Sequence, residues 1–400
     1  MNDTQAKYPQ LRFKGFADPW EQCKLGDVAK ITMGQSPNSK NYTDNPKDHI
    51  LVQGNADMKD GQVHPRIWTT EITKIADKGD LILSVRAPVG DIGKTSYDVV
   101  IGRGVAAIKG NEFIFQLLKR MKTVGYWTKY STGSTFESIN SLEINNAVIN
   151  LPKEHEQNKV GKILSYMDHA ITLHEEKKRQ LERLKSALLQ KMFADKNGYP
   201  AVRFEGFSDE WEERKLSDLF IKGGSGGTPK STNKDFYDGD IPFLGISDIT
   251  KSNGFINNTE KHISSDGLNS SAAWIVSKGA ISLAMYASVG KLAILNIDAA
   301  TSQAFYNMIF DDYDLRDLVY QRLNKANELS EWNKLISTGT QSNLNADKVK
   351  NFQMYLPKNH DEIKLISTFF KKIDNAIALH QRKLDLLKEQ KKGFLQKMFV

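Results

Sequence analysis

A long repeated segment constrains this chain more than any other feature. Residues 151–193 and 356–400 both begin with Leu-Pro-Lys, and both end at a Lys-Met-Phe tripeptide or one residue beyond it. Leu151 and Leu356 are 205 positions apart, whereas Lys191 and Lys397 are 206 apart, so the second copy holds one inserted residue. Two copies of so long a segment indicate an internally duplicated protein. A repeat of this kind determines how the rest of the sequence is interpreted.

Each copy has the apolar spacing of a long helix. Apolar residues recur every three or four positions, which is the period of a coiled-coil seam. The seam positions are Ile163, Met167, Ala170, Leu181, Leu184 and Leu188 in the first copy, and Ile366, Phe370, Ile373, Ile377, Leu384, Leu387, Phe394 and Met398 in the second. Proline occurs only in the opening Leu-Pro, where a helix tolerates it. We predict two helices of about 40 residues, each ~60 Å long, that pair with each other; the alternative is that each covers only its own domain.

A second repeat precedes each of two less similar stretches. Residues 9–20 (PQLRFKGFADPW) correspond to residues 200–211 (PAVRFEGFSDEW), at a separation of 191 positions. The stretches that follow, 21–150 and 212–355, share only short matches. These are Gly54-x-x-Asp57 with Gly245-x-x-Asp248, Lys78-Gly79 with Lys278-Gly279, Val89-Gly90 with Val289-Gly290, and Ser131-Thr132-Gly133 with Ser337-Thr338-Gly339.

The short apolar runs of both stretches are typical of strands. LILSV, ISLAM, AILNI and FYNMIF are rich in β-branched and aromatic residues, whereas FIFQLLKRMKTV and LRDLVYQRLNKANEL have helical spacing. We therefore predict an α+β protein in which two mixed α/β domains are separated by the long helices, with an internal pseudo-twofold repeat. The predicted ranges are 1–150 for the first domain, 151–195 for the central helix, 196–355 for the second domain and 356–400 for the last helix.

Charge and composition narrow the class of protein. The formal net charge is +7, and the two helical segments alone carry +3 and +5, so the basic excess lies there. Such an excess suits a polyanionic partner, although a solvated helix face would also explain it. The single cysteine, Cys23, excludes a disulfide framework. The N-terminus has no apolar signal region and no apolar run reaches 18 residues, so we expect a soluble cytoplasmic protein.

Catalytic motifs are absent from the sequence. Residues 88–95 (PVGDIGKT) imitate a phosphate-binding loop but place Pro88 where that motif needs glycine, so a strand turn is expected. The glycine-rich residues 222–230 suit either a phosphate cradle or a flexible loop. The histidines show no metal-binding spacing, and no Asn-Pro-Pro-aromatic tetrad of amino-methyltransferases is present. We assign no catalytic residue and no metal ligand.

The whole plan resembles one protein family. Two unlike domains are each followed by a long helix that opens with Leu-Pro, as in Leu151-Pro152-Lys153 and Leu356-Pro357-Lys358, and the Arg-Phe-x-Gly-Phe…Trp block and the Lys-Met-Phe endings accompany them. This arrangement is similar to the specificity subunit of type I restriction-modification enzymes. One departure is Asp361-Glu362, where the first copy has Glu156-Gln157.

The resemblance implies a function in DNA recognition. Each variable domain would read one half of a split double-stranded DNA site, and the helices would pack antiparallel as a spacer between the half-sites. The chain would dock two adenine-N6 methyltransferase subunits, which carry S-adenosylmethionine, and through them the restriction subunits that use ATP and Mg²⁺. No cofactor is expected in this chain. The alternatives are a stand-alone DNA-modifying enzyme and a scaffold without a ligand.

Comparison of the two stretches suggests which residues contact DNA. At a separation of 200 positions, Arg103 corresponds to Gln303 and Arg86 to Tyr286. Arginine suits the two acceptors of guanine and glutamine the donor–acceptor pair of adenine, whereas a phosphate contact is the alternative for Arg103. The complete set of candidate DNA-binding residues is Gln35, Gln53, Asn55, Arg86, Arg103, Thr228, Lys230, Ser247, Tyr286 and Gln303.

Overall fold

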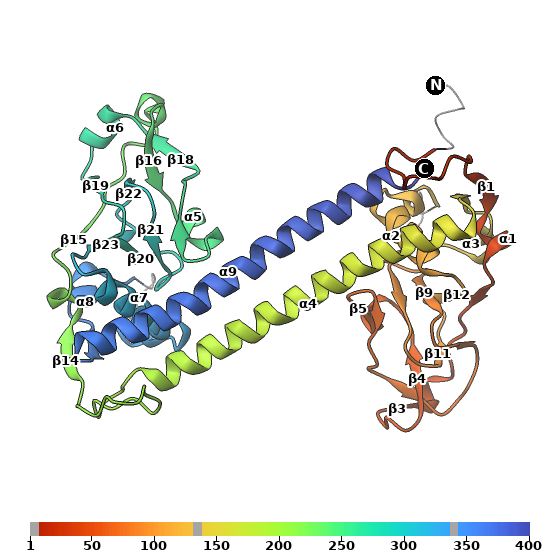
Figure 1. Cartoon of the computed structure of the whole chain (residues 1–400), viewed down its shortest axis with the longest axis horizontal. Helices are drawn as coiled ribbons and strands as arrows, with labels where there is room; N and C mark the ends of the chain where they lie inside the picture. Colours follow the sequence, from red (N-terminus) through yellow and green to blue (C-terminus); the bar gives the residue numbers. More distant parts are fainter. Residues whose placement is uncertain (1–7, 131–137, 337–342) are drawn as a thin grey trace. The chain divides into compact units, whose positions relative to one another are not determined.

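The chain forms two compact units in a computed structural model that describes residues 8–130, 138–336 and 343–400. Unit 1 comprises residues 1–174 and 383–400, and unit 2 comprises residues 175–382. Each unit holds one mixed α/β region together with part of both long helices (Figure 1). The four predicted consecutive ranges cut the chain differently and stay a prediction. The matched Ser-Thr-Gly tripeptides at 131–133 and 337–339 lie outside the described residues.

The two long helices are α4 (Glu154–Met192) and α9 (His360–Lys397). They begin three to four residues later than the sequence predicts, because each opening leucine ends a strand, β13 (Val148–Leu151) or β24 (Gln353–Leu356). Proline disfavours the helical conformation in the residue before it, so Leu-Pro marks the end of a strand here. β13 pairs antiparallel with β1 (Glu21–Lys24), and β24 with β14 (Glu212–Lys215).

Both units contain a contact between α4 and α9. In unit 1, Lys391 of α9 pairs with Asp168 of α4, and in unit 2, Lys185 of α4 pairs with Asp374 of α9. The early part of one helix thus meets the late part of the other in either unit, as the predicted antiparallel pairing requires. Leu184 was wrongly predicted to lie in the seam, since 49% of it is exposed; the next residue, Lys185, faces the partner helix instead.

Unit 1 contains two larger sheets. Apart from the edge strands β5 and β3, their strand order is the same as in unit 2, which confirms that the two stretches share a fold although few of their residues match. The first sheet has the order β2 (Ile31–Met33), β12 (Val105–Ile108), β9 (Leu81–Ser84), β10 (Ile92–Lys94), β6 (Gln62–Val63) and β5 (Met58–Lys59). The second has the order β3 (Tyr42–Thr43), β7 (Trp68–Thr69), β4 (His49–Val52), β11 (Val99–Ile101) and β8 (Ile75–Ala76).

Unit 2 repeats this plan with slightly fewer strands. In both units one parallel strand pair lies in the smaller sheet, β4 with β11 and β16 with β22. The first sheet has the order β15 (Lys222–Ser225), β23 (Phe305–Ile309), β20 (Ile281–Ala284), β21 (Leu292–Leu295) and β17 (Phe255–Ile256). The second has the order β18 (Lys261–Ile263), β16 (Ile241–Leu244), β22 (Ala299–Thr301) and β19 (Ile275–Val276).

One helix of each α/β region packs against the long helices. It is α2 (Glu112–Thr123) in unit 1 and α7 (Tyr313–Glu328) in unit 2, both as predicted. Five shorter helices are α1 (Leu25–Val28), α3 (Ser141–Asn145), α5 (Ile246–Lys251), α6 (Ser265–Asn269) and α8 (Ala346–Lys350).

Two glycines account for one of the matched motifs. Gly90 and Gly290 have φ values of +88° and +86°, which side chains rarely adopt. A Cβ atom at either position would lie 2.5 Å from Trp127 or 2.4 Å from Trp332. The matched Val-Gly residues thus form a turn against a buried tryptophan. Residues 88–95, which resemble a phosphate-binding loop, contain this turn between strands, as the sequence predicts.

The repeated blocks meet in the core of each unit. The tryptophan of the block packs edge-on against the phenylalanine of a helix ending, Trp20 with Phe399 and Trp211 with Phe193, with ring centroids 6.3 Å apart in both pairs. Edge-on packing of this kind adds to the stabilisation from burial. The Arg-Phe-x-Gly-Phe…Trp block and the Lys-Met-Phe ending are therefore two halves of one packing motif.

The arginine of each block binds the opening of a long helix. Arg12 donates two hydrogen bonds to Glu156, both 2.7 Å long, and Arg203 donates two to Glu362, at 2.7 and 2.8 Å. Glu362 is therefore the counterpart of Glu156, and the inserted residue lies before it. The apparent departure at Asp361-Glu362 was an error of alignment, and the helix openings match.

We expect Glu362→Gln to lower the free energy of unfolding by about 3–5 kcal/mol, because the substitution leaves the half-buried Arg203 without its counter-charge. The Glu362 side chain is 1% exposed. Chemical denaturation followed by tryptophan fluorescence measures the effect. The matched control is Lys153→Ala, which breaks the solvent-exposed Lys153–Asp18 pair and should leave the transition almost unmoved; equal shifts for both variants would contradict the assignment.

Candidate nucleic-acid interface

Four loops of unit 1 converge at one place, which we name the first loop edge (residues 34–36, 53–55, 85–86 and 102–104). Three hydrogen bonds between main-chain atoms join them: Gln35 N to Ile101 O at 2.8 Å, Gly102 N to Val52 O at 2.8 Å, and Val85 N to Gly104 O at 2.9 Å. The loops follow the ends of β2, β4, β9 and β11. Loops held on a rigid sheet are the usual location of binding residues.

Unit 2 builds the same arrangement, the second loop edge (residues 226–228, 245–247, 285–286 and 302–304). Gly227 N donates to Thr301 O at 3.0 Å, and Met285 N donates to Ala304 O at 2.7 Å. Leu244, which ends β16, pairs in parallel with Thr301. The backbone frame of the two edges is therefore shared, as the sequence comparison predicts.

Glycines bring the loops of both edges into contact. A Cβ atom at Gly34 would lie 2.0 Å from the carbonyl oxygen of Gly102, and one at Gly226 would lie 1.8 Å from that of Thr301. The glycine-rich segment 222–230 is in part a strand. Its first four residues form β15, paired with β23, and its glycines admit the neighbouring backbone.

A buried aspartate holds one loop of each edge. Asp57 accepts hydrogen bonds from Gln53 N at 2.7 Å and Arg66 Nε at 3.0 Å. Asp248 accepts from Gly245 N at 2.8 Å and Glu260 N at 3.0 Å. The Gly-x-x-Asp match in the sequence is thus a loop clamp, and the sequence analysis did not assign that role to either aspartate.

The predicted DNA-binding residues of unit 1 lie on the first loop edge or directly beside it. Arg103 is exposed, and its backbone N donates to Ser36 Oγ at 3.0 Å. Arg86 is exposed and follows Val85, while Gln35 and Gln53 are held through their backbone N atoms. Asn55 begins a short 3-10 turn, with no contact between its side chain and the other candidates in the described part of the chain.

In unit 2 one pair of predicted residues is in direct contact. Thr228 Oγ1 donates a 2.5 Å hydrogen bond to Gln303 Oε1. Ser247 Oγ instead donates to Glu260 at 3.0 Å, and the hydrogen bonds of Lys251 and Ser247 lower the pKa of that carboxyl. Tyr286 is exposed on this edge and Lys230 beside it, and the structure describes no contact from their side chains to Gln303. Whether any of the ten candidates contacts DNA stays a prediction.

Two further residues contribute to the interface that the sequence analysis missed. Ser36 fixes the backbone of Arg103, and Arg66, which is 49% exposed, places a third arginine near the first loop edge through its ion pair with Asp57. A pattern in the sequence could have revealed Ser36: each loop has a glycine two positions before a hydroxyl residue, Gly34 before Ser36 and Gly226 before Thr228. No such pattern indicates Arg66.

The model of the type I restriction modification DNA specificity domain matches this chain twice, over residues 17–183 and 208–389. The chain belongs to this family. Each match contains one loop edge and much of one long helix, so the internal duplication of the sequence is a duplication of the family's domain.

Curated relatives have the same description. The chain is 31% identical over 188 residues to the putative type I restriction enzyme MjaX specificity subunit of Methanocaldococcus jannaschii, a match over 45% of this chain and 44% of the relative, which is less than half of its length. It is 22% identical over 445 residues to the type I restriction enzyme HindI specificity subunit of Haemophilus influenzae, over 90% of this chain and 95% of the relative.

Solved structures share the fold. The crystal structure of a type I restriction-modification S subunit from M. genitalium matches 98% of this chain and 99% of its own with a TM-score of 0.67 and 14% identity. A chain from a structural study of type I restriction-modification complex assembly matches 94% of this chain and 97% of its own, with a TM-score of 0.52 and 18% identity. At these identities the likeness concerns architecture. Among the described helices of this family member, none is long and apolar enough to cross a bilayer.

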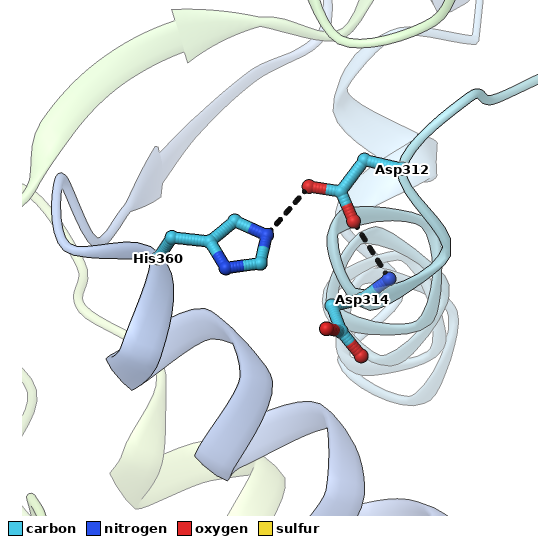
Figure 2. A group of neighbouring side chains, drawn as sticks. All are labelled: Asp312, Asp314 and His360. Atoms are coloured by element: carbon cyan, nitrogen blue, oxygen red, sulfur yellow. Dashed lines mark hydrogen bonds and ion pairs between the residues drawn. The ribbon is translucent and has the colours of Figure 1, made fainter.

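One group of potential metal ligands lies away from the loop edges. Asp312, Asp314 and His360 place ligand atoms within 4.8 Å of one another. Asp312 caps α7, accepting from Asp314 N at 2.8 Å and Leu315 N at 3.0 Å, and its other oxygen lies 2.8 Å from His360 Nε2 (Figure 2). These contacts use both oxygens of Asp312, so we assign the group the structural role of linking α7 to α9.

We expect acid to weaken this link. Burial acts to raise the pKa of Asp312, but the N–H groups of Leu315 and Asp314 and the ring of His360 outweigh burial and lower the pKa below its usual range. A carboxyl with a lowered pKa stabilises the fold above its unfolded pKa of about 3.9, and this stabilisation disappears as the pH falls through the lower folded-state pKa.

The difference in denaturation midpoint between the wild type and Asp312→Asn should therefore be largest near pH 6 and shrink towards pH 2–3. Urea titrations at several pH values measure it, with Asp314→Asn as the control. A difference that grows on acidification would contradict the assignment.

Proposed function

We propose that each loop edge reads one half of a split double-stranded DNA site and that α4 and α9 set the gap between the halves. The observation that carries this proposal is the pair of loop edges. Two equal backbone frames carry different exposed polar side chains, Arg103 in one and Gln303 in the other. Such pairs suit two different short sequences, since base edges are distinguished by hydrogen-bond donors and acceptors.

Exposed apolar residues on the long helices support docking of two copies of one partner. In unit 1 these are Tyr166, Leu173 and Leu386, and in unit 2 they are Leu184, Leu365 and Leu379. Leu173 and Leu379 are equivalent positions of the repeat, and both are nearly half exposed (48% and 46%). The recurrence of exposed leucines at equivalent positions of the repeat favours an interaction surface, and a repeated surface suits a repeated partner, for which we propose the methyltransferase subunit.

The chemistry is assigned to those partners. We propose that adenine methylation with S-adenosylmethionine takes place on the two methyltransferase subunits, and that ATP- and Mg²⁺-dependent restriction takes place on subunits bound through them. This chain selects the site and is not itself catalytic, and it acts in the cytoplasm, where the cell's DNA lies. The proposal rests on the membership of the family and on the absence of a catalytic motif from the sequence.

A map of methylated adenines in cells that express this chain with its methyltransferase tests the function directly. The expected result is a motif of two unlike short sequences separated by unspecified bases. A continuous palindromic motif would contradict the two-edge proposal. The alternative of a stand-alone enzyme is tested with the purified chain, S-adenosylmethionine, Mg²⁺ and DNA, where methyl transfer or cleavage without partners would replace our proposal.

We expect Arg103→Ala to relax the base preference at one position of the first half-site by about 1–3 kcal/mol and to leave the second half-site unchanged. The reason is that the guanidinium of Arg103 is exposed and makes no hydrogen bond or ion pair to any residue that the structure describes. Binding of the assembled methyltransferase complex to a set of single-base variants measures the change.

The same titration at two salt concentrations separates a base contact from a phosphate contact. Loss of a phosphate contact weakens binding to all sequences alike and lowers the salt slope by about one. A uniform loss across the set would reject a base contact by Arg103. Lys14→Ala, at an exposed lysine of the repeated block, serves as a control for nonspecific charge removal.

We expect an insertion of seven residues into both long helices to lengthen the preferred gap by about three base pairs. Seven residues preserve the 3.5-residue period and add ~10.5 Å, compared with 3.4 Å for each base pair. Positions 174/175 and 382/383, where the two units meet in each helix, are suitable sites. The methylation motif gives the result. Unchanged spacing, or changed bases in either half-site, would exclude a spacer role.

A further inference from the structure

One hydroxyl group has different tasks in the two loop edges. In unit 1, Ser36 Oγ accepts a hydrogen bond from the backbone N of Arg103 at 3.0 Å. In unit 2, Thr228 Oγ1 donates to the side-chain oxygen Oε1 of Gln303 at 2.5 Å. Ser36 therefore holds the main chain of Arg103 and makes no described contact with its guanidinium, whereas Thr228 holds the side-chain amide of Gln303.

The two hydroxyls occupy equivalent positions. The residue before Ser36 donates its backbone N–H to Ile101 O, and the residue before Thr228 donates its own to Thr301 O. Ile101 is the last residue of β11, and Thr301 is the last residue of β22, the equivalent strand of unit 2. The different tasks therefore do not come from a shifted loop. They come from the side chains that face the hydroxyl, Arg103 in one unit and Gln303 in the other.

The position of Thr228 is fixed by its neighbours on both sides. The carbonyl of Ser225 accepts a hydrogen bond from Trp274 Nε1 at 3.1 Å. Pro229 is buried, and its carbonyl accepts from Tyr237 OH at 2.7 Å. A hydroxyl held in this way can fix the direction of an amide, whereas a hydroxyl on a mobile loop would move with it.

The direction of the amide decides what Gln303 can read. A glutamine amide has one acceptor oxygen and an NH₂ group with two donors. The bidentate contact to adenine needs the oxygen for N6–H₂ and the NH₂ for N7, whereas guanine presents two acceptors, N7 and O6. Thr228 holds Oε1 towards itself, so the NH₂ group is the part of the Gln303 amide that is turned away from Thr228 and presented to a base, and that group matches the acceptors of guanine.

We propose that Thr228 is a positioning residue that fixes the direction of the Gln303 amide, so that the second loop edge presents the NH₂ group of Gln303 and prefers guanine at that position. This inference rests on the proposed reading of DNA by the loop edges. It replaces the pairing of Gln303 with adenine that the sequence suggests. Both edges then present donors at this position, the guanidinium of Arg103 in one and the amide NH₂ of Gln303 in the other.

The test uses the complex assembled with its methyltransferase subunits and a set of duplexes that vary each base pair of the second half-site. Gln303→Ala first locates the position that Gln303 reads. The wild type should prefer guanine to adenine there by about five- to 140-fold, the discrimination of one good base contact. Thr228→Val keeps the shape but removes the hydroxyl, so the freed amide should accept adenine and this ratio should fall towards one. Thr228→Ser should restore it.

The controls separate this inference from a merely structural role. Ser36→Ala should leave the guanine-to-adenine ratio in the second half-site unchanged. Equal weakening on all duplexes by Thr228→Val and Thr228→Ala would show that the hydroxyl stabilises the loop without setting base preference, and would overturn the inference. A wild-type preference for adenine, or an unchanged ratio in Thr228→Val, would overturn it as well while leaving the proposed function intact. Binding of all duplexes with equal affinity by the wild type would instead remove the proposed function and the inference with it.

Discussion

A half-buried carboxylate at the contact of three helices is the constraint on which each unit depends. Asp168 of α4 accepts a hydrogen bond from Gln116 of α2 at 2.8 Å and pairs with Lys391 of α9. Although burial opposes ionisation, Lys119 and Lys391 lower the pKa of Asp168 and keep it charged. Unit 2 repeats the arrangement with Asp374, Gln321 and Lys185. Through these ion pairs and glutamine hydrogen bonds, the triad links α4 to α9 and attaches the α/β region to both.

The repeated sequence blocks bind the openings and endings of the long helices, and the variable residues lie on the loop edges. The pairs of tryptophan with phenylalanine and of arginine with glutamate recur in both units because they close the core around the long helices. The loop edges, in contrast, are joined mainly through backbone atoms and glycines. A frame held by backbone contacts does not depend on the side chains that it presents. This explains how two domains can share every main strand pairing and yet expose Arg103 in one and Gln303 in the other.

The sequence predicted the fold well wherever a pattern was repeated. It predicted the long helices, their pairing, α2, α7 and several strands. The hydrophobic period can be recognised within one segment, and the duplication can be recognised by comparing the two halves of the sequence. It failed where a residue's task is set by a partner far along the chain. Glu362 was misaligned because its equivalence to Glu156 shows only in its ion pair with Arg203, 159 positions away. Leu184 was placed in the seam because the period alone does not reveal that Lys185 finds a carboxylate. Of the candidate site, the sequence located the loops but not the hydrogen bond that occupies the oxygen of Gln303.

The division into two units has a consequence for specificity. Residues more than 7–10 Å apart without shared partners contribute additively to free energy, and each loop edge has its own strands, its own clamping aspartate and its own hydroxyl. Under the proposed function, two edges that each discriminate modestly would multiply their selectivities on one duplex, because their free energies add. In this proposal the long helices contribute the gap between half-sites, and they share no residue with either loop edge. The target sequence can accordingly change by substitution at the edges while Asp168 and Asp374 keep the helices, and the spacing that we propose they set, unchanged.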